Sequence, residues 1–325
     1  MPSERAALSA VLLSLLCLLL PCASAMAQTF PSKPIRTIMT VGGGLEILGR
    51  MVAQGLTESL GRPVVLETQS GAGGAIGAEM VARAAPDGHT LALMGPQTML
   101  VRKHLVKNVP YDPVSDFTPI GQVVETTAII VSYTGLPANN LREVIEYARR
   151  NPGKLDYGTS GIGTSQHFSA ESITQLTGIR WNHIPYKAGP PVLTDLMTGR
   201  IHVGFSIMAT MVPFLNSDKI RIIAINSEKR YPSLPELPTV TEIIPGYERP
   251  PTWSAYFGPA GLPRDIVIRL NSELNRIMAI AAVREKSQGA GLLPSTGTPE
   301  ELAAMVKRDY AGIGRMVKQL GLVAE

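Results

Sequence analysis

Three glycine-rich segments carry the residue types best suited to binding a ligand. Gly42-Gly43-Gly44, Gly71 to Gly74 and Gly158 to Ser165 each follow an apolar run and precede a helical pattern. Glycine lets the backbone approach a ligand closely, and the free N–H groups and dipole of a helix N-terminus favour an anion. One such segment alone is as readily a tight turn without a ligand. Three together predict an anion site, for which a carboxylate is as suitable as a phosphate.

The third segment adds four hydroxyl groups, on Thr159, Ser160, Thr164 and Ser165. These hydroxyls can donate to an anion, and Thr164 can equally cap the helix that follows. Ligands of parallel α/β sheets bind at the carboxyl ends of the strands. We therefore expect these segments, which come from two halves of the chain, to face one cleft.

Signatures of catalysis are scarce. The five histidines form no H-x-x-x-H or H-E-x-x-H arrangement, and no G-x-S-x-G or phosphate-loop motif is present. Gly71 to Gly77 is similar to a dinucleotide fingerprint, but its third glycine comes one residue late and no acid ends the next strand. We predict no catalytic residue, no metal and no cofactor. An exported α/β enzyme acting on a small organic acid remains the alternative, because active sites also assemble from distant residues.

Strand-like and helical patterns alternate between these segments, which is typical of a parallel sheet with covering helices. The residues Leu48, Met51, Val52, Leu56 and Leu60, for example, recur at the three- and four-residue spacing of a helix with one buried face. Longer helical patterns run from Ser165 to Thr177, from Arg264 to Ile280 and from Pro299 to Leu320. The chain is therefore predicted to be an α/β protein.

The strand–helix alternation occurs in two blocks, and a proline-rich stretch from Tyr231 to Pro251 follows the second block. We expect that stretch to be a connection over the surface. Two crossing strands, Thr126 to Tyr133 and Thr252 to Gly258, would join two lobes. The predicted lobes are 28–127 with 253–325 (lobe 1) and 128–252 (lobe 2). A single continuous sheet is the alternative.

The N-terminus has the order of a secretory signal peptide over residues 1–27. Arg5 precedes an apolar run from Ala6 to Leu20, and small residues lead to a cleavage site near Ala27. The run of about 15 residues is short of the roughly 20 that a membrane anchor needs. Both cysteines, Cys17 and Cys22, lie in this segment. The mature protein would be periplasmic and without a thiol.

The balance of charge and aromatic residues argues against nucleic-acid binding. The net charge is +4 and only 5% of the residues are aromatic, whereas nucleic-acid binding favours a concentrated basic stripe with stacking platforms. We expect no nucleic-acid partner, and a monomer.

The mature chain resembles the Bug family, the substrate-binding receptors of tripartite tricarboxylate transporters. The motifs that carry the resemblance are Pro31-Ser32-Lys33-Pro34-Ile35-Arg36, Ser70 to Glu79, Ala85 to Leu91, Pro110 to Pro113 through Asp116-Phe117, Tyr157 to His167, Ile184 to Lys187, Leu237 to Val240 and Phe257 to Gly261. The resemblance implies a two-lobed Venus-flytrap fold of type II. It implies a small carboxylate ligand and, as partner, a two-component membrane permease.

In this family the first two loops hold a ligand carboxylate, often through ordered water, and the second lobe closes over it. The ligand-binding positions expected here are Gly42, Gly43, Gly44, Glu46, Gly71, Ala72, Gly73, Gly74, Ala75, Gln97, Thr98, Thr159, Ser160, Gly163, Thr164, Tyr186 and Ser206. The first loop departs from the family pattern, since it is about two residues shorter, lacks the prolines and has Glu46 for an aspartate. Ser206 stands where an acid is common, which disfavours an amino-acid ligand.

Overall fold

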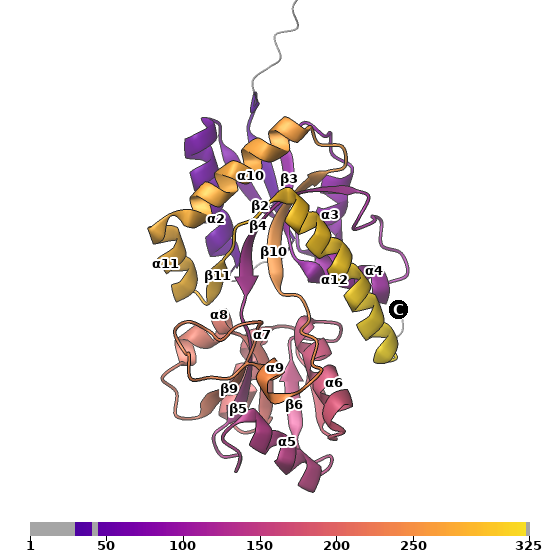
Figure 1. Cartoon of the computed structure of the whole chain (residues 1–325), viewed down its shortest axis with the longest axis vertical. Coiled ribbons are helices and arrows are strands. Elements are labelled where there is room, and N and C mark those ends of the chain that lie inside the picture. The colour runs from indigo at the N-terminus through magenta and orange to yellow at the C-terminus, as the bar shows by residue number, and fades with distance from the viewer. Residues whose placement is uncertain (1–29, 41–44, 323–325) are drawn as a thin grey trace, which may run out of the picture.

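The computed structural model describes residues 30–40 and 45–322. The predicted signal peptide, 1–27, and the predicted ligand residues Gly42, Gly43 and Gly44 lie outside the described residues. The described chain forms two α/β lobes, one above the other, each built on its own sheet (Figure 1). The two-lobed α/β prediction is confirmed, and the single continuous sheet is wrong.

Lobe 1 is built on a six-stranded sheet with the order β11-β4-β10-β3-β1-β2. The strands are β1 (Ile35–Met39), β2 (Val64–Thr68), β3 (Thr90–Met94), β4 (Phe117–Thr126), β10 (Trp253–Pro259) and β11 (Leu292–Pro294). Strands β1, β2 and β3 are parallel, while β10 runs antiparallel between β3 and β4. The last part of the chain therefore supplies a central strand of the first lobe.

Helices cover both faces of this sheet. One face packs against α2 (Leu45–Leu60), α10 (Arg264–Ala279) and α11 (Ala281–Gly289), and the other against α3 (Ala75–Ala82), α4 (Arg102–Leu105) and α12 (Pro299–Gln319). A 3₁₀ turn, η1 (Gly71–Gly74), precedes α3, and a π-helical turn, η2 (Gln97–Val101), precedes α4. Both turns start shortly after a parallel strand ends, which places them at the same edge of the sheet.

Lobe 2 is built on a five-stranded sheet with the order β7-β6-β8-β5-β9. The strands are β5 (Ala128–Tyr133), β6 (Asp156–Thr159), β7 (Asn182–Pro185), β8 (Val203–Ile207) and β9 (Ile220–Asn226). One face packs against α5 (Leu141–Arg150), α6 (Ser165–Thr177) and α9 (Val240–Ile243), and the other against α7 (Gly189–Met197), α8 (Met208–Met211) and η3 (Val212–Phe214).

Two segments run side by side between the lobes. Only Thr127 separates β4 from β5, and the Thr126 amide donates to the Thr252 carbonyl oxygen over 3.0 Å. Arg249 ties the two segments together, because its guanidinium lies 3.0 Å from the Glu125 carboxylate and donates to the Thr252 hydroxyl over 2.9 Å. The lobe boundaries at 127/128 and 252/253 stay a prediction, which the position of this crossing supports.

The proline-rich stretch from Tyr231 to Pro251 differs from its prediction. Tyr231, Val240, Ile244 and Tyr247 are buried in the cores of lobe 2. The prediction of a surface connection is therefore wrong for these residues, because the apolar side chains between the prolines pack on the sheet. No helix in the described part of the chain is both long and apolar enough to cross a membrane.

Candidate functional site

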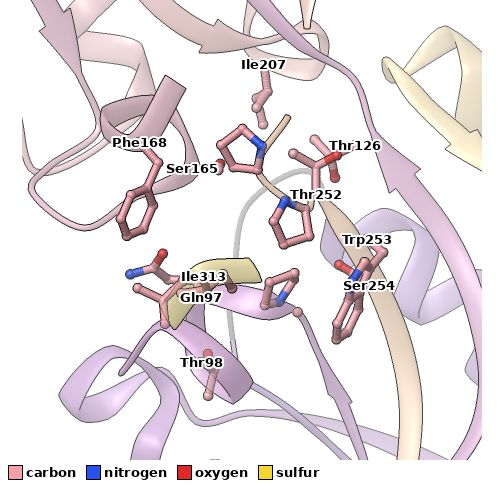
Figure 2. A pocket seen from close by; sticks show the side chains of 15 residues that line it. Gln97, Thr98, Thr126, Ser165, Phe168, Ile207, Thr252, Trp253, Ser254 and Ile313 are labelled. Atoms are coloured by element: carbon pink, nitrogen blue, oxygen red, sulfur yellow. The ribbon is translucent and has the colours of Figure 1, made fainter. Parts of the chain in front are cut away.

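A cavity of about 160 Å³ lies between the lobes, beside the crossing segments. It is lined by Gly95, Pro96, Gln97, Thr98, Val101, Thr126, Ser165, Phe168, Ile207, Pro250, Pro251, Thr252, Trp253, Ser254 and Ile313. Figure 2 shows Phe168, from lobe 2, facing Gln97 and Ile313, from lobe 1. Both lobes therefore contribute to one small site.

None of the described residues that line this cavity has a charged side chain. Its polar side-chain groups are the Gln97 amide, the Trp253 indole N–H, which donates to Asp309, and the hydroxyls of Thr98, Thr126, Ser165, Thr252 and Ser254, and the rest is mainly apolar. A hydroxyl or an amide N–H can donate to an anion, while the apolar walls suit a hydrocarbon body. The cavity is chemically suited to a small molecule with an acidic end and an apolar part.

The second glycine segment supports one side of the cavity by its backbone shape. Ala72, Gly73 and Gly74 have φ of 49°, 61° and 88°, in the left-handed region that favours glycine. A Cβ on Gly74 would lie 2.9 Å from the Thr40 carbonyl oxygen, and the Thr98 hydroxyl is also in contact with that position. Thr98 in turn donates to the Gly73 carbonyl oxygen over 3.2 Å. The turn therefore packs directly against Thr98, which lines the cavity.

Arg102 is the cation beside this turn. A Cβ on Gly73 would lie 2.5 Å from Arg102 Nη1, so the guanidinium packs against the glycine. Arg102 also lines a second hollow of about 230 Å³, with Gln97, Val101, Leu105, Val106, Ile162 and Leu322. This hollow adjoins the first cavity, because Gln97 and Val101 line both. Positive charge is therefore available next to the uncharged cavity.

The third glycine segment is held by hydrogen bonds. Thr164 caps α6 by accepting from the His167 amide over 3.3 Å, and its hydroxyl donates to the Gly161 carbonyl oxygen over 2.7 Å. The buried Thr159 hydroxyl accepts from the Gly161 amide over 3.2 Å. The Gly163 amide donates to His167 Nδ1 over 3.2 Å. These bonds fix the loop directly in front of Ser165, which lines the cavity.

Two stacked imidazoles lie beneath this loop. The rings of His167 and His183 have their centroids 4.6 Å apart at 16°, and Tyr157 stacks on His183 at 4.8 Å and 14°. The Thr159 hydroxyl and His183 Nε2 share a hydrogen bond of 2.7 Å. Burial lowers the pKa of both histidines, and the neighbouring His167 lowers that of His183 further, to about 4. Both rings are therefore neutral at neutral pH.

The structure brings some of the predicted ligand residues to the cavity and leaves others apart from it. Gln97 and Thr98 line it, and Gly71, Ala72, Gly73, Gly74 and Ala75 form the adjoining turn and the first residue of α3. Thr159, Ser160, Gly163 and Thr164 lie in the third segment, just before Ser165. Glu46 is on the surface of α2, paired with Arg50 at 2.5 Å. The ligand roles of all these residues stay predictions.

Tyr186 and Ser206 lie in lobe 2, away from the cavity lining. The Tyr186 hydroxyl donates to the Asp195 carboxylate over 2.8 Å. Ser206 is buried at the end of β8, and its hydroxyl makes no hydrogen bond within the described residues. The nearby Gly189 backbone at the start of α7 would place a Cβ 3.9 Å from that hydroxyl. Ser206 therefore retains a free donor close to a helix N-terminus.

Several lining residues were not among the predicted ligand positions. Thr126 and Thr252 lie in segments that the sequence predicts as crossings, so their place at the lobe junction could have been used to find them. Phe168, Ile207 and Ile313 carry no such signal, because each is an apolar residue in an apolar pattern. No cluster of three or more His, Cys, Asp or Glu that could hold a metal was found in residues 30–40 and 45–322.

Comparisons with known proteins agree with one another. Residues 48–322 match the family model described as "Tripartite tricarboxylate transporter family receptor". A UPF0065 protein from Pseudomonas sp. (strain P51) is 32% identical over 286 residues, with 87% of this chain and 84% of that protein covered. Protein BugT of Bordetella pertussis is 29% identical, with 91% of each chain covered.

Solved structures are also similar. An R. palustris protein with adipate is 29% identical, with a TM-score of 0.80 and with 91% of this chain and all of that one covered. The periplasmic binding protein BugD gives 30% identity and a TM-score of 0.75, with 91% and 100% covered. MatC of Rhodopseudomonas palustris with bound malate is 26% identical, with a TM-score of 0.74 and with 89% of this chain and all of that one covered. The chain therefore belongs to the tripartite tricarboxylate transporter receptors, a family of solute-binding proteins that includes periplasmic binding proteins of the Bug type.

Proposed function

We propose that the protein captures a small carboxylate in the cavity between its lobes and delivers it, unchanged, to a two-component membrane permease. The observation that carries this proposal is the uncharged interlobe cavity, which combines hydroxyl and amide donors with apolar walls. Structural relatives with adipate and with malate support the ligand class. The small volume of the cavity favours a small acid over a drug-sized ligand, whose pockets span about 300–1,000 Å³.

Neutral donors would hold the acid. The Gln97 amide and the Ser165 hydroxyl come from opposite lobes. The Ser165 hydroxyl donates to Gln166 Oε1 over 3.2 Å and would turn to the ligand. Ser165 is also the first residue of α6, whose N-terminus favours negative charge. The guanidinium of Arg102 adds a cation beside the second glycine turn. A carboxylate placed here would satisfy these donors without a fully buried ion pair, which is costly to desolvate.

Ligand capture would be conformational. A ligand stabilises a closed arrangement of the lobes only through the extra contacts that it makes there. Gln97 and Ser165 supply such contacts, because a molecule touching both must bridge the lobes. Rotation about the two crossing segments would open the same cavity.

The cavity lining also favours binding over catalysis. None of the described residues that line the cavity is an Asp, Glu or His, and a general base must lie within hydrogen-bond reach of a nucleophile. The receptor family supports the same choice over an enzyme acting on an acid. Export through a signal peptide over 1–27, a periplasmic location and a monomeric state complete the proposal.

Calorimetry of the protein with adipate, malate and other mono-, di- and tricarboxylates tests this function. A ligand at about 100 times its dissociation constant should stabilise the fold by about 2.7 kcal/mol, which raises Tm by several degrees. Gln97→Leu, which keeps the side-chain size, should weaken binding about tenfold, whereas Gln54→Leu on the surface of α2 should not. A panel without any binding acid, or an acid recovered chemically altered, would exclude the proposal.

A further inference from the structure

We infer that His167 is a positioning residue for the third glycine segment, and that its unprotonated Nδ1 keeps this segment in place until acid protonates it. The effect on ligand binding rests on the proposed function. The effect on the segment itself does not, because it follows from the hydrogen bonds of the free protein.

The donor at Gly163 defines the state of the His167 ring. A backbone N–H can only donate, and it donates to His167 Nδ1 over 3.2 Å. That nitrogen must therefore carry no proton, and the neutral ring has its proton on Nε2. Nε2 lies 3.9 Å from the Glu171 carboxylate. A cationic His167 would point an N–H at the N–H of Gly163 and break the bond.

The buried Gly163 N–H needs His167 Nδ1 as its hydrogen-bond acceptor. Gly163 is buried with φ of 74°, a conformation that glycine adopts readily and other residues rarely do. A buried N–H without a partner costs about 1–3 kcal/mol. Loss of the acceptor would release the turn that joins the predicted ligand residues Thr159 and Thr164.

His183 reinforces the requirement for a neutral ring. Its ring stacks on His167 with 4.6 Å between centroids, so two cationic rings would repel each other at short range. The hydroxyl of Thr159 also bonds to His183 Nε2 over 2.7 Å. The two histidines therefore hold the two ends of the segment, His183 through Thr159 and His167 through Gly163.

The groups around the stack come from three elements, α6, β6 and β8. Glu171 on α6 is the acid that faces His167, and its carboxylate also accepts the Tyr157 hydroxyl over 2.5 Å. Tyr157 on β6 covers the other side of His183, and Phe205 on β8 packs edge-on against Tyr157. Asp156 is on the opposite face of β6, because side chains alternate along a strand, and it lies 3.9 Å from His202 Nδ1. The Glu171 carboxylate favours the protonated form of His167, whereas burial favours the neutral form. Burial has the larger effect, so the pKa of His167 is lowered.

The direct test is nuclear magnetic resonance of the free protein with ¹⁵N-labelled histidine and backbone. At pH 7 we expect His167 to be neutral, with Nδ1 unprotonated and the proton on Nε2. As acid protonates His167, the Gly163 amide should lose its protection from hydrogen exchange before global unfolding. A protonated Nδ1 at pH 7, or a Gly163 amide indifferent to the titration of His167, would overturn the inference.

Two variants separate positioning from packing. His167→Asn places an amide oxygen near the position of Nδ1 and does not titrate, whereas His167→Phe keeps a stacked ring without an acceptor. With adipate and malate as probes at pH 7, we expect Asn to bind within about threefold of the wild type and Phe to bind about tenfold more weakly. Gly163 protection in the Asn variant should persist on acidification.

Equal affinity and equal Gly163 protection in the Phe variant would overturn the inference. If His167→Phe does not fold, the wild-type spectra and the Asn variant still decide it. If neither acid binds the wild-type protein, the proposed ligand class fails, and the ring tautomer and the amide exchange remain as independent readouts of the positioning role.

Discussion

The second and third glycine segments occupy equivalent places, each after a parallel strand and before a helix, yet they are held in different ways. Gly71 to Gly74 forms a turn with three consecutive left-handed residues, and no side chain caps the helix behind it. Gly158 to Ser165 is held by the hydroxyls of Thr159 and Thr164 and by the ring of His167. The second segment depends mainly on glycine at crowded left-handed positions, whereas the third depends on hydrogen bonds from its own side chains and from His167. An added side chain should therefore disturb the second segment, whereas acid or the loss of a hydroxyl should disturb the third.

The largest effect is expected from Gly74→Ala. Its Cβ would lie 2.9 Å from the Thr40 carbonyl oxygen, at φ of 88°, so both overlap and backbone strain oppose it. We expect the free energy of unfolding to fall by about 2–4 kcal/mol, measured by guanidinium denaturation. Gly178→Ala is the matched control, since its φ is 68° and nothing lies within 4 Å of its Cβ; about 1 kcal/mol is expected there. Equal losses would mean that crowding does not hold the second segment.

Acid should reduce the stability that the third segment contributes and leave that of the second segment unchanged. Burial lowers the pKa of His167, and that of His183 to about 4, against about 6.5 in the unfolded chain. The stability that the neutral rings contribute is thus complete above about pH 6.5 and is lost as the pH falls towards 4. Because His183 is only half-buried, we expect on the order of 1–2 kcal/mol over this range.

The measurement is the slope of unfolding free energy against pH, compared between the wild type and His183→Gln. Glutamine keeps a partner for Thr159 and does not titrate, so its slope between pH 4 and 6.5 should be smaller. Identical slopes would assign the pH dependence to other groups.

Thr164→Val removes two hydrogen bonds of the third segment at nearly constant volume. The variant loses the acceptor for the His167 amide and the donor to the Gly161 carbonyl oxygen, and about 1 kcal/mol of stability should be lost. Thr164→Ser keeps the hydroxyl and should restore most of it. Thermal denaturation checks both, and a serine variant as unstable as the valine variant would assign the loss to the methyl group.

The smallest effect on stability is expected from Ser160→Ala. Ser160 is partly exposed, and its hydroxyl makes no hydrogen bond to another described residue, so stability should change by less than about 0.5 kcal/mol. If Ser160 contacts the ligand, as we predict, adipate affinity should fall several-fold while Tm stays constant. Unchanged affinity would remove Ser160 from the site.

Much of the fold could be predicted because the apolar periodicity is strong. The helix from Ser165 to Thr177 was expected within those bounds and is found there. Strand β4 was mostly missed, since Pro119, Gly121 and Gln122 interrupt its apolar pattern. The pairing of β10 between β3 and β4 has no local signal, because it joins residues far apart in the chain.

Less of the site than of the fold could be predicted from the sequence. Glycine turns and hydroxyl groups can be recognised directly from the residue types. Of the predicted ligand residues, Gln97 and Thr98 line the cavity. Ile313 and Phe168 are indistinguishable in sequence from ordinary core residues and reach the cavity only through the packing of α12 and α6. Nor does the sequence indicate that His167 and His183 stack, because that contact depends on how α6 lies against β7.

The central place of β10 in lobe 1 also dictates the order in which the molecule can fold. All five strands of lobe 2 come from one continuous stretch, Ala128 to Asn226, so this sheet can assemble as soon as that stretch is available. Strands β3 and β4, synthesised earlier, keep edges without a partner until residues 253–259 arrive. Unpaired edges are templates for aggregation. A chain that ends before residue 253 therefore contains every strand of lobe 2, whereas β3 and β4 of lobe 1 still lack their shared partner β10 and need protection from other chains.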